Sequence, residues 1–405
     1  MDHFGFIIGA AILTYTFFFW LSRIREIQDN RKWVPTLDPD AQTSLPEKLP
    51  LISVLVPAHN EEKVIEFCIQ SILDQDYGNF ELICVDDRST DQTAVLVKKL
   101  FEGKNNCRLL SIKKRQVGWT GKCHALNVGS KVAKGEWLAF IDADSSLHPR
   151  ALTQCLNEAL KRRINLITLT PKFILRTFWE KALQPSLASM AAILFPLSQV
   201  NDPASPVATA NGMFFMVSKM AYDRIGGHKN VKGLAVEDIG IGKRIKAARL
   251  GILFANGQNI LFTRMYSNCA DILKGWTRIL SAAMNYRLST VIKYLPMHIL
   301  VSLPCLVAAL FLYVNPAIQI IPNSWFVLPV ACIWAITIGL FKFFDQLGLP
   351  RRYSTYIVLG NLALILVHLI MLKKILCRDA LQWRGETYST TRYQPKCLDP
   401  SSTEH

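Results

Sequence analysis

Between about residues 51 and 287, short apolar runs alternate with amphipathic stretches. The runs are rich in β-branched and large apolar residues and end in turn-forming residues, which is typical of buried strands. The stretches between them carry apolar residues three and four positions apart, which indicates helices. Strands that alternate with helices predict an α/β domain with a mainly parallel sheet. The predicted strands are 51–56, 80–85, 108–112 and 137–141.

A longer apolar run covers residues 4–21, which is about the length that crosses a bilayer. No basic stretch precedes this run and no small-residue cleavage motif follows it, so we expect an anchor and not a cleaved signal peptide. Arg23, Arg25, Arg31 and Lys32 follow directly. By the positive-inside rule, they predict that the N-terminus lies outside and the chain from Arg23 onward lies in the cytoplasm. The alternative is a buried core helix.

Three further apolar segments near the C-terminus, 297–314, 325–340 and 356–372, each have the composition of a membrane span. If all three cross the bilayer, the basic tail that follows lands outside, against the positive-inside rule. One segment could instead be re-entrant or lie in the interface, or the tail could break the rule; the sequence leaves these alternatives open. Another apolar stretch, 182–197, contains two prolines and is predicted to be an interfacial or an acceptor-side segment and not a span.

The composition agrees with a chain that works at a membrane. Of its 405 residues, 50% are hydrophobic and 19% are charged, which excludes a disordered chain. Ten cysteines are scattered without a zinc-binding pattern, so we expect reduced thiols in a cytosolic environment. The net charge of +15 comes from basic residues that flank the apolar segments, which favours a membrane surface over nucleic acid as the partner.

Four predicted strands end in polar sequences, and the carboxyl ends of parallel strands are where α/β sheets bind ligands. The sequences are Pro57-Ala-His-Asn-Glu61-Glu, Asp86-Asp87-Arg-Ser-Thr-Asp, Gly118-Trp-Thr-Gly-Lys122 and Asp142-Ala-Asp144. Taken alone, the first could be a helix cap and the second a capped turn. The third resembles the end of a P-loop, but Gln116 and Cys123 stand where a P-loop has Gly and Ser or Thr, so a P-loop is excluded.

The pair Asp142 and Asp144 is the most informative of these sequences. Residues two apart on an extended segment project to the same side, so the two carboxylates would face each other. Like charges that close are costly unless a proton or a cation lies between them. Oxygen ligands favour a hard divalent ion, so the pair predicts an Mg²⁺ or Mn²⁺ site that also holds substrate phosphates. A chance Asp-x-Asp is the alternative.

Together, these motifs and Glu237-Asp238 resemble glycosyltransferase family 2, whose members have the GT-A fold, over about residues 50–287. The segments 118–122, 263–266 with 275–277, and 382–388 resemble the membrane-bound branch that glycosylates terpenoid lipids of the carotenoid and hopanoid type. The resemblance implies a metal-dependent, inverting hexosyltransferase. It would move a hexose from a nucleotide sugar to a hydroxyl of a hydrophobic lipid. UDP-glucose is the favoured donor and a carotenoid is the favoured acceptor.

The resemblance also implies a role for each matching residue. Asp86 and Asp87 would hold the uracil or ribose, and Pro57 and Glu61 would line the nucleotide pocket. Lys122 would lie near the diphosphate, Asp142 and Asp144 would hold the metal, and Glu237 would bind substrate beside the catalytic base Asp238. Before the resemblance is considered, a helix cap is an equally good explanation of Asp238.

One departure from the family is clear. Processive and sphingolipid members carry Q-x-x-R-W near the first C-terminal span, and no Arg-Trp pair occurs in this chain. Trp276 and Arg278 stand about where that motif would fall, so they are predicted either to close over the diphosphate or to lie at the level of the lipid headgroups.

The predicted organisation is an α/β GT-A domain between an N-terminal transmembrane helix and a C-terminal bundle of two to three such helices, in the cytoplasmic membrane with the α/β domain inside. Its parts are an anchor 1–22, a linker 23–49, the catalytic domain 50–290, a transmembrane region 291–375 and a basic tail 376–405. The expected partners are a nucleotide sugar, a lipid acceptor and membrane lipid, with no nucleic acid. Hopanoid, sphingolipid and polyprenyl-phosphate acceptors stay open. So does a non-enzymatic, membrane-anchored nucleotide-binding or transport protein.

Overall fold

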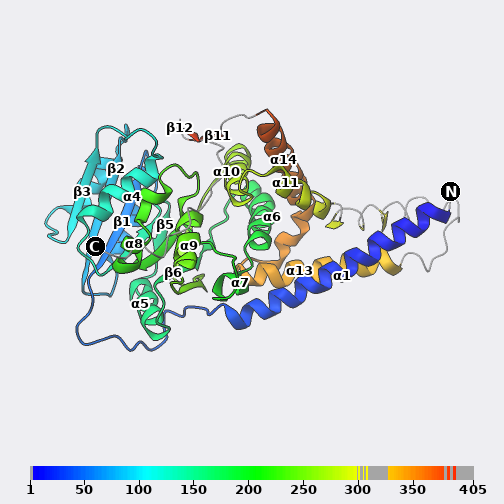
Figure 1. Ribbon diagram of the computed structural model, residues 1–405, viewed down its shortest axis with the longest axis horizontal. Helices are drawn as coiled ribbons and strands as arrows, with labels where there is room; N and C mark the ends of the chain where they lie inside the picture. Colours follow the sequence, from blue (N-terminus) through cyan, green and yellow to red (C-terminus); the bar gives the residue numbers. More distant parts are fainter. Residues whose placement is uncertain are drawn as a thin grey trace. The chain divides into compact units, whose positions relative to one another are not determined.

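The computed structural model describes residues 3–298, 300, 301, 304, 307, 308, 327–377, 381–383 and 386–388 (Figure 1). The chain divides into two compact units. We call residues 33–174 and 195–265, with the chain from 380 onward, the sheet unit, and residues 1–32, 175–194 and 266–379 the helical unit. This division differs from the predicted boundaries, because 175–194 and 266–290 belong to the helical unit.

The sheet unit is built on a seven-stranded sheet in the order β3-β2-β1-β4-β8-β6-β9. Its strands are β1 (Ile52–Ala58), β2 (Phe80–Asp87), β3 (Cys107–Ile112), β4 (Trp137–Ile141), β6 (Leu166–Thr170), β8 (Phe214–Ser218) and β9 (Ile252–Asn256). All neighbours pair in parallel except β8, which runs antiparallel to both β4 and β6. A second sheet has the order β5-β10-β7, from β5 (Ser145–Leu147), β7 (Lys172–Phe173) and β10 (Leu261–Thr263), and β11 (Leu381–Trp383) pairs with β12 (Glu386–Tyr388).

Helices cover both faces of the large sheet, which is why its strands read as continuous apolar runs. Along β1, Val54 and Val56 point into one core and Leu55 into the other, as the alternation of a strand requires. The first core is shared with α2 (Ile65–Leu73), α3 (Thr93–Phe101) and α5 (Ala151–Lys161). The second is shared with α4 (Gly121–Val132), α8 (Lys219–Arg224), the 3₁₀ turn η1 (Gly227–Val231) and α9 (Glu237–Ala247), and α7 (Leu197–Asn201) lies against β9.

The predicted α/β class with a mainly parallel sheet is confirmed, and the four predicted strands correspond to β1 to β4. The sequence reasoning missed β6, β8 and β9. Each has five residues, the same length as β4, and a short apolar run by itself does not distinguish a strand from part of a buried helix.

The helical unit contains α1 (His3–Trp33), α6 (Phe178–Leu194), α10 (Cys269–Ala283), α11 (Leu288–Tyr294), α13 (Val327–Gln346), the 3₁₀ segment η3 (Arg351–Tyr356) and α14 (Ile357–Leu376). The stretch predicted to be interfacial is mostly α6, which continues through Pro185 and packs against α10 and α14. Helix α1 runs eleven residues beyond the predicted anchor, into the segment predicted to be a linker. An ion pair between Arg23 and Glu26, one turn apart, supports this extension.

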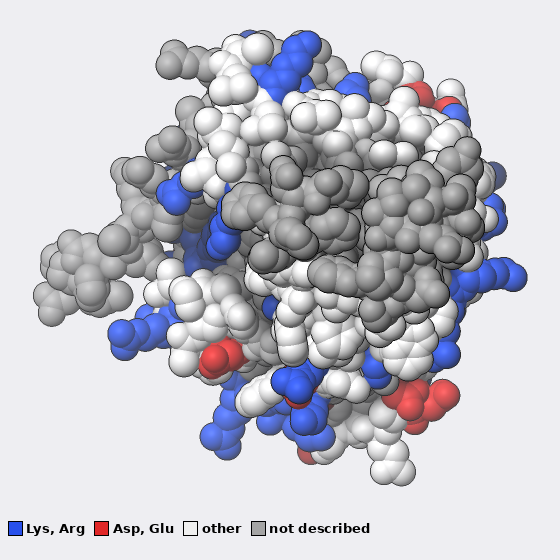
Figure 2. Space-filling model, turned by 90° about the vertical axis from the view of Figure 1, so that its right-hand side faces the viewer, with Lys and Arg blue, Asp and Glu red and all other residues white. Residues whose placement is uncertain are grey.

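Two segments of the described chain are long and apolar enough to cross a membrane, Val327–Gln346 and Arg351–Leu376. They correspond to the second and third predicted C-terminal spans. The first, 297–314, falls mostly outside the described residues. Helix α1 does not appear among these candidates, so its role as an anchor stays a prediction. On the face drawn in Figure 2, Lys and Arg side chains are more frequent than Asp and Glu, in agreement with the net charge of +15.

Candidate functional site

The carboxyl end of β4 carries Asp142 and Asp144, as the sequence predicts. The side chain of Asp142 keeps 29% of its surface exposed, and its backbone N–H donates to the Met213 carbonyl at 3.3 Å. The backbone carbonyl of Asp144 accepts a hydrogen bond from the Thr263 hydroxyl, which ties this turn to β10. Both acids therefore lie at the edge of the sheet where ligands of α/β domains bind.

The antiparallel strand β8 adds a segment to this edge that the sequence reasoning missed. Because β8 runs opposite to β4, its start lies beside the end of β4, and Phe214 pairs with Ile141. The residues just before β8 therefore reach the same edge, and the backbone N–H of Gly212 donates to Asp238 Oδ2 at 2.5 Å. The signal available in the sequence was a glycine directly before an apolar run, two positions before β8 begins.

Lys122 joins the acids from two elements. Its Nζ lies 2.7 Å from Asp142 Oδ1 and 2.6 Å from Glu237 Oε1. Lys122 is in the first turn of α4, which begins after Thr120, where the Thr120 hydroxyl accepts a hydrogen bond from the Cys123 backbone N–H. Burial opposes the charge of Lys122, but Asp142, Glu237 and Asp238 outweigh it and hold the pKa of the ammonium well above its ordinary value.

Glu237 and Asp238 are adjacent in sequence but have opposite protonation preferences. Burial would raise the pKa of Glu237, but the ammonium of Lys122 prevails and lowers it. For Asp238, burial and the charge of Glu237 raise the pKa to about 7. Asp238 Oδ1 accepts from the backbone N–H of Ile239 at 2.7 Å. The N-cap residue of α9 is Val236, so Asp238 does not occupy the cap position, although its contact with Ile239 satisfies one N–H of the first turn.

Close backbone packing holds Asp238 in position. An added Cβ on Gly242 of α9 would lie 2.5 Å from the Thr209 carbonyl carbon, so the helix sits directly on the chain that leads into β8. At Gly212, an added Cβ would lie 2.9 Å from both Asp238 Oδ2 and Lys122 Nζ. Gly212 is therefore in contact distance of the cation and of the carboxylate with the raised pKa.

We expect Gly212→Ala to lower the turnover rate about 100-fold, because the methyl group must displace Lys122 or Asp238 and displacements of about 1 Å at a reacting centre cost that much. The measurement is steady-state sugar transfer by the purified variant. Gly78→Ala is the matched control, since an added Cβ there has nothing within 4 Å. An unchanged rate for Gly212→Ala would contradict the close packing at this point.

The ends of β1 and β2 are tied to each other beside this site. Pro57 and Ala58 pair with the last residues of β2. Asn60, with a φ of 56°, accepts a hydrogen bond from the Thr90 backbone N–H instead of capping α2, which corrects the capping alternative. Asp86 Oδ1 accepts a hydrogen bond from the Ser89 backbone N–H at 3.2 Å, which is the contact expected of a capped turn.

Asp87 is buried and held on both sides. Arg88 donates to both of its carboxylate oxygens, at 2.9 and 3.0 Å, and a ring nitrogen of His59 lies 2.6 Å from its carbonyl oxygen. Burial lowers the pKa of His124, and the charge of Asp87 opposes that change. His124 follows Lys122 by two residues on α4, so Asp87 lies near the same helix that carries Lys122.

The buried thiol of Cys68 lies within the electrostatic influence of acidic residues that follow both β1 and β4. Burial raises the pKa of the Cys68 thiol well above its ordinary value. The neighbouring thiol of Cys84 and the charges of Asp144, Asp142 and Glu61 raise it further. Cys68 Sγ also lies 3.6 Å from the Asp142 carbonyl oxygen. The carboxylates of Glu61, Asp142 and Asp144 therefore act on one point. The carboxylates of the predicted site, at 61, 86, 87, 142, 144, 237 and 238, all belong to the sheet unit.

The carboxylates of Asp142 and Asp144 could supply part of the coordination shell of a hard divalent cation. Asp142 and Asp144 offer carboxylate oxygens only, which suit Mg²⁺ or Mn²⁺. In the described residues, no group of three or more His, Cys, Asp or Glu side chains comes together with ligand geometry. The protein would therefore supply two ligands and leave the remaining positions to water and substrate phosphates, which is how Mg²⁺ is usually held. Lys122 carries the positive charge beside Asp142.

Trp276 and Arg278 belong to α10 in the helical unit, whereas the residues above belong to the sheet unit. Trp276 is buried, so within the described structure its ring does not face outward as a headgroup anchor would. Their predicted role over the diphosphate stays a prediction.

Comparison with known proteins agrees with the resemblance seen in the sequence. Residues 53–226 match the glycosyl transferase family 2 profile, a range that includes Asp87, Lys122, Asp142 and Asp144 and ends before Asp238. The chain is 24% identical over 255 residues to 4,4'-diaponeurosporenoate glycosyltransferase of Staphylococcus haemolyticus (strain JCSC1435), covering 62% of this chain and 66% of the relative. It is 26% identical over 234 residues to the enzyme of the same name from Staphylococcus aureus (strain MRSA252), covering 57% and 60%.

The chain thus spans less than two thirds of the length of either relative. Among solved structures, it is similar to the mannosyltransferase PcManGT from Pyrobaculum calidifontis in complex with GDP-Man and Mn²⁺, with 17% identity and a TM-score of 0.49 over 82% of this chain and 99% of that one. The profile match therefore shows a glycosyl transferase family 2 domain over residues 53–226, and both curated relatives are named as glycosyltransferases.

Proposed function

We propose that this protein is a membrane-bound, inverting glycosyltransferase that moves a hexose from a nucleotide sugar to a hydroxyl of a carotenoid, with UDP-glucose as the favoured donor. The observation that carries the proposal is the contact of Lys122 with both Asp142 and Glu237, next to the carboxylate of Asp238. The family 2 domain and two curated relatives named for transfer to diaponeurosporenoate support the class of reaction and of acceptor.

The donor end of the site would stabilise a departing diphosphate. Asp142 and Asp144 would hold a divalent ion, which supplies positive charge to the diphosphate oxygens when it is bound. Lys122 adds a fixed ammonium from α4. Asp86 and Asp87 would hold the nucleoside at the end of β2, and Pro57 and Glu61 would line its pocket at the end of β1.

The acceptor end would use Asp238 as general base. The acceptor oxygen bonds to the anomeric carbon while the bond from that carbon to the diphosphate oxygen breaks, and the electron pair leaves with the diphosphate. The hydroxyl proton passes to the Asp238 carboxylate. The N–H groups of Gly212 and Ile239 hold that carboxylate on both oxygens, which fixes its orientation. Attack from the face opposite the leaving group inverts the anomeric centre.

We expect the rate of transfer to rise with pH and to level off above about pH 7. The environment of Asp238 raises its pKa to about 7, so below that value the carboxylate is protonated and cannot accept the acceptor's proton. The measurement is kcat/KM from pH 5 to 9 at constant ionic strength, with a slope of about one logarithmic unit per pH unit on the acidic side, as expected for one ionisation. A flat profile down to pH 5 would contradict a base with a raised pKa.

The acceptor is tested by expressing the chain in a host that makes hydroxylated carotenoids, and by extracting the pigments. We expect a new glycosylated pigment with the intact chain and none with Asp238→Asn. Unchanged pigments together with a new glycosylated hopanoid, sphingolipid or polyprenyl phosphate would reject the carotenoid and keep the transferase. No new glycolipid, with membranes that also fail to release the nucleotide from a labelled sugar donor, would reject both.

A further inference from the structure

We propose that α14 does not cross the bilayer. The geometry points to a helix that lies in the interface between membrane and cytoplasm and inserts one apolar face into the lipid, so that the chain after it stays on the cytoplasmic side. The inference rests on the membrane association that forms part of the proposed function.

Helices α1 and α13 form a parallel pair. Cys332 Sγ lies 3.2 Å from the Leu13 carbonyl oxygen, and Gln346 Nε2 donates to the Ile27 carbonyl at 2.6 Å. Between these contacts, the ring of Trp20 packs against Gly339 of α13, where a Cβ added to the glycine would lie 2.9 Å from the ring. Each of these pairs is separated by 319 residues, so the two helices run in the same direction in constant register. The apolar run of α1 therefore lies level with that of α13.

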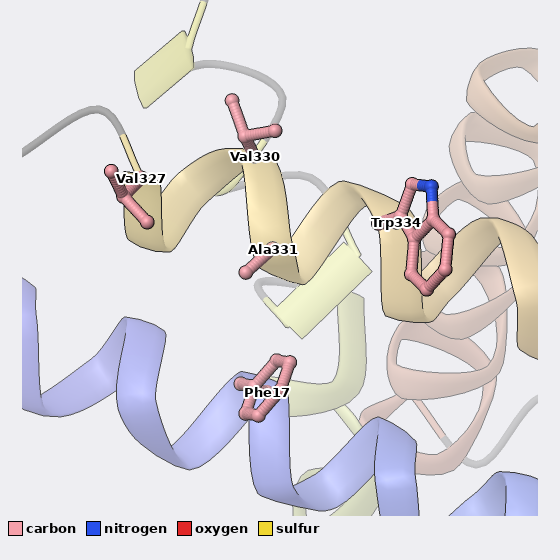
Figure 3. Close-up of a pocket in the computed structure, with 5 residues that line it drawn as sticks. All are labelled: Phe17, Val327, Val330, Ala331 and Trp334. Atoms are coloured by element: carbon pink, nitrogen blue, oxygen red, sulfur yellow. The ribbon is translucent and has the colours of Figure 1, made fainter.

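The outer surface of this pair suits lipid. An open groove between the two helices is lined by Phe17 of α1 and by Val327, Val330, Ala331 and Trp334 of α13 (Figure 3). Its lining is almost entirely apolar. Trp334 keeps 70% of its surface exposed, and in water a stripe of this kind would be costly. We therefore infer that, among the described helices, this pair spans the bilayer.

Helix α14 is not aligned with the pair. In Figure 1, α1 and α13 lie side by side, whereas α14 runs at a steep angle to both. It packs instead against α6 and α10. Asp271 and Lys274 of α10 are exposed. Exposed charges of this kind are expensive in hydrocarbon, so they oppose a position of α10, and of the helix that packs on it, in the middle of the bilayer.

The two faces of α14 match an in-plane position. Large apolar side chains are exposed along one face at helical spacing: Val358, Leu362, Leu366, Leu369 and Leu376. The opposite face is buried against the protein, mostly through apolar side chains, and it also carries Asn361 and His368. His298 joins Asn361 and His368 there through ring nitrogens, at 3.0 and 3.2 Å. An interfacial helix needs only one apolar face in lipid, and α14 presents such a face opposite its contacts with the protein.

Basic residues mark both ends of the exposed face. Arg351 and Arg352 precede α14, and Lys373 and Lys374 are in its last turn. Anionic headgroups attract such residues by about 1 kcal/mol each near the surface. With α14 in the interface, all four lie on the cytoplasmic side, and so does the basic tail. The conflict with the positive-inside rule that arises from three C-terminal crossings then disappears.

The test is the labelling of single cysteines in the full-length protein with a membrane-impermeant maleimide. In a background in which the other reactive cysteines are replaced by Ser, Cys377 at the end of α14 is kept, since it is native and exposed. Val327→Cys reports the start of α13, and Lys131→Cys reports the sheet unit; both positions are exposed. We expect Val327→Cys to react in intact cells, and Cys377 and Lys131→Cys to react at least 10-fold more after permeabilisation.

Reaction of Cys377 in intact cells, with Lys131→Cys protected, would show that α14 crosses the bilayer and would overturn the inference. Protection of both Val327→Cys and Cys377 in intact cells would overturn the orientation of the α1 and α13 pair on which it depends. Recovery of the protein in the soluble fraction, with all three sites reactive in lysates without detergent, would instead reject the membrane association in the proposed function. Sugar transfer by each cysteine variant confirms that it is folded.

Discussion

Asp238→Asn is expected to lower the rate of sugar transfer by about 1,000-fold or more while leaving the protein folded, because a positioned general base contributes about 10²–10⁴ to such reactions. The asparagine keeps the size of the side chain, and its oxygen can still accept the hydrogen bond from the Gly212 or Ile239 N–H. What it loses is the lone pair basic enough to take a proton. The measurement is transfer from a labelled nucleotide sugar under saturating donor.

Asp223→Asn is the matched control. Asp223 is an exposed aspartate of the same unit, on α8, where it pairs with Lys219. We expect its activity to equal that of the unchanged chain. Donor binding by Asp238→Asn, followed by calorimetry, should also be close to normal. Full activity of Asp238→Asn would exclude the base role, and a loss of donor binding equal to the loss of rate would assign Asp238 to the donor instead.

Lys122→Met is expected to have the second largest effect, with a loss of about 10²–10³ in rate, which is the usual consequence of removing one fixed donor to developing negative charge. It should also destabilise the fold. Lys122 is the ion-pair partner of Glu237, whose side chain is only 6% exposed, and a buried charge left without its partner costs about 3–5 kcal/mol. The measurements are the transfer rate and the midpoint of thermal unfolding in detergent.

A double variant separates the two effects. In Lys122→Met with Glu237→Gln, the buried charge of Glu237 is removed together with its partner, so we expect most of the stability to return and the rate to stay low. Lys131→Met is the control for the loss of a lysine from α4, because Lys131 is exposed at the other end of that helix. If the double variant regained activity together with stability, Lys122 would be a structural residue and the proposed contact with the diphosphate would be wrong.

The strands at the centre of the sheet could be predicted because their pattern is local. A fully buried strand such as β4 is a continuous apolar run, and the acids that follow it in the sequence necessarily lie at its end. The family resemblance selected Asp142, Asp144 and Asp238 for the same reason: the motifs are short and contiguous. Folding then had to bring these motifs together, which the local pattern does not encode.

The partners of the predicted residues came from contacts between distant segments. Lys122 was expected near the diphosphate, but its pairing with Glu237 joins residues 115 positions apart through the packing of α4 and α9 on one face of the sheet. Gly212 reaches the site because β8 runs antiparallel to β4, and the direction of a strand leaves no mark on its own apolar pattern.

Residue spacing within a few turns or strand lengths is enough to predict the alternation of strands and helices, the acidic residues at the strand ends and the apolar segments. Three properties depend instead on the packed fold: which acid faces a cation, which carboxylate has a raised pKa, and which apolar helix runs parallel to α1. Those properties depend on burial and on charges from remote parts of the chain, and burial is created only when the elements pack.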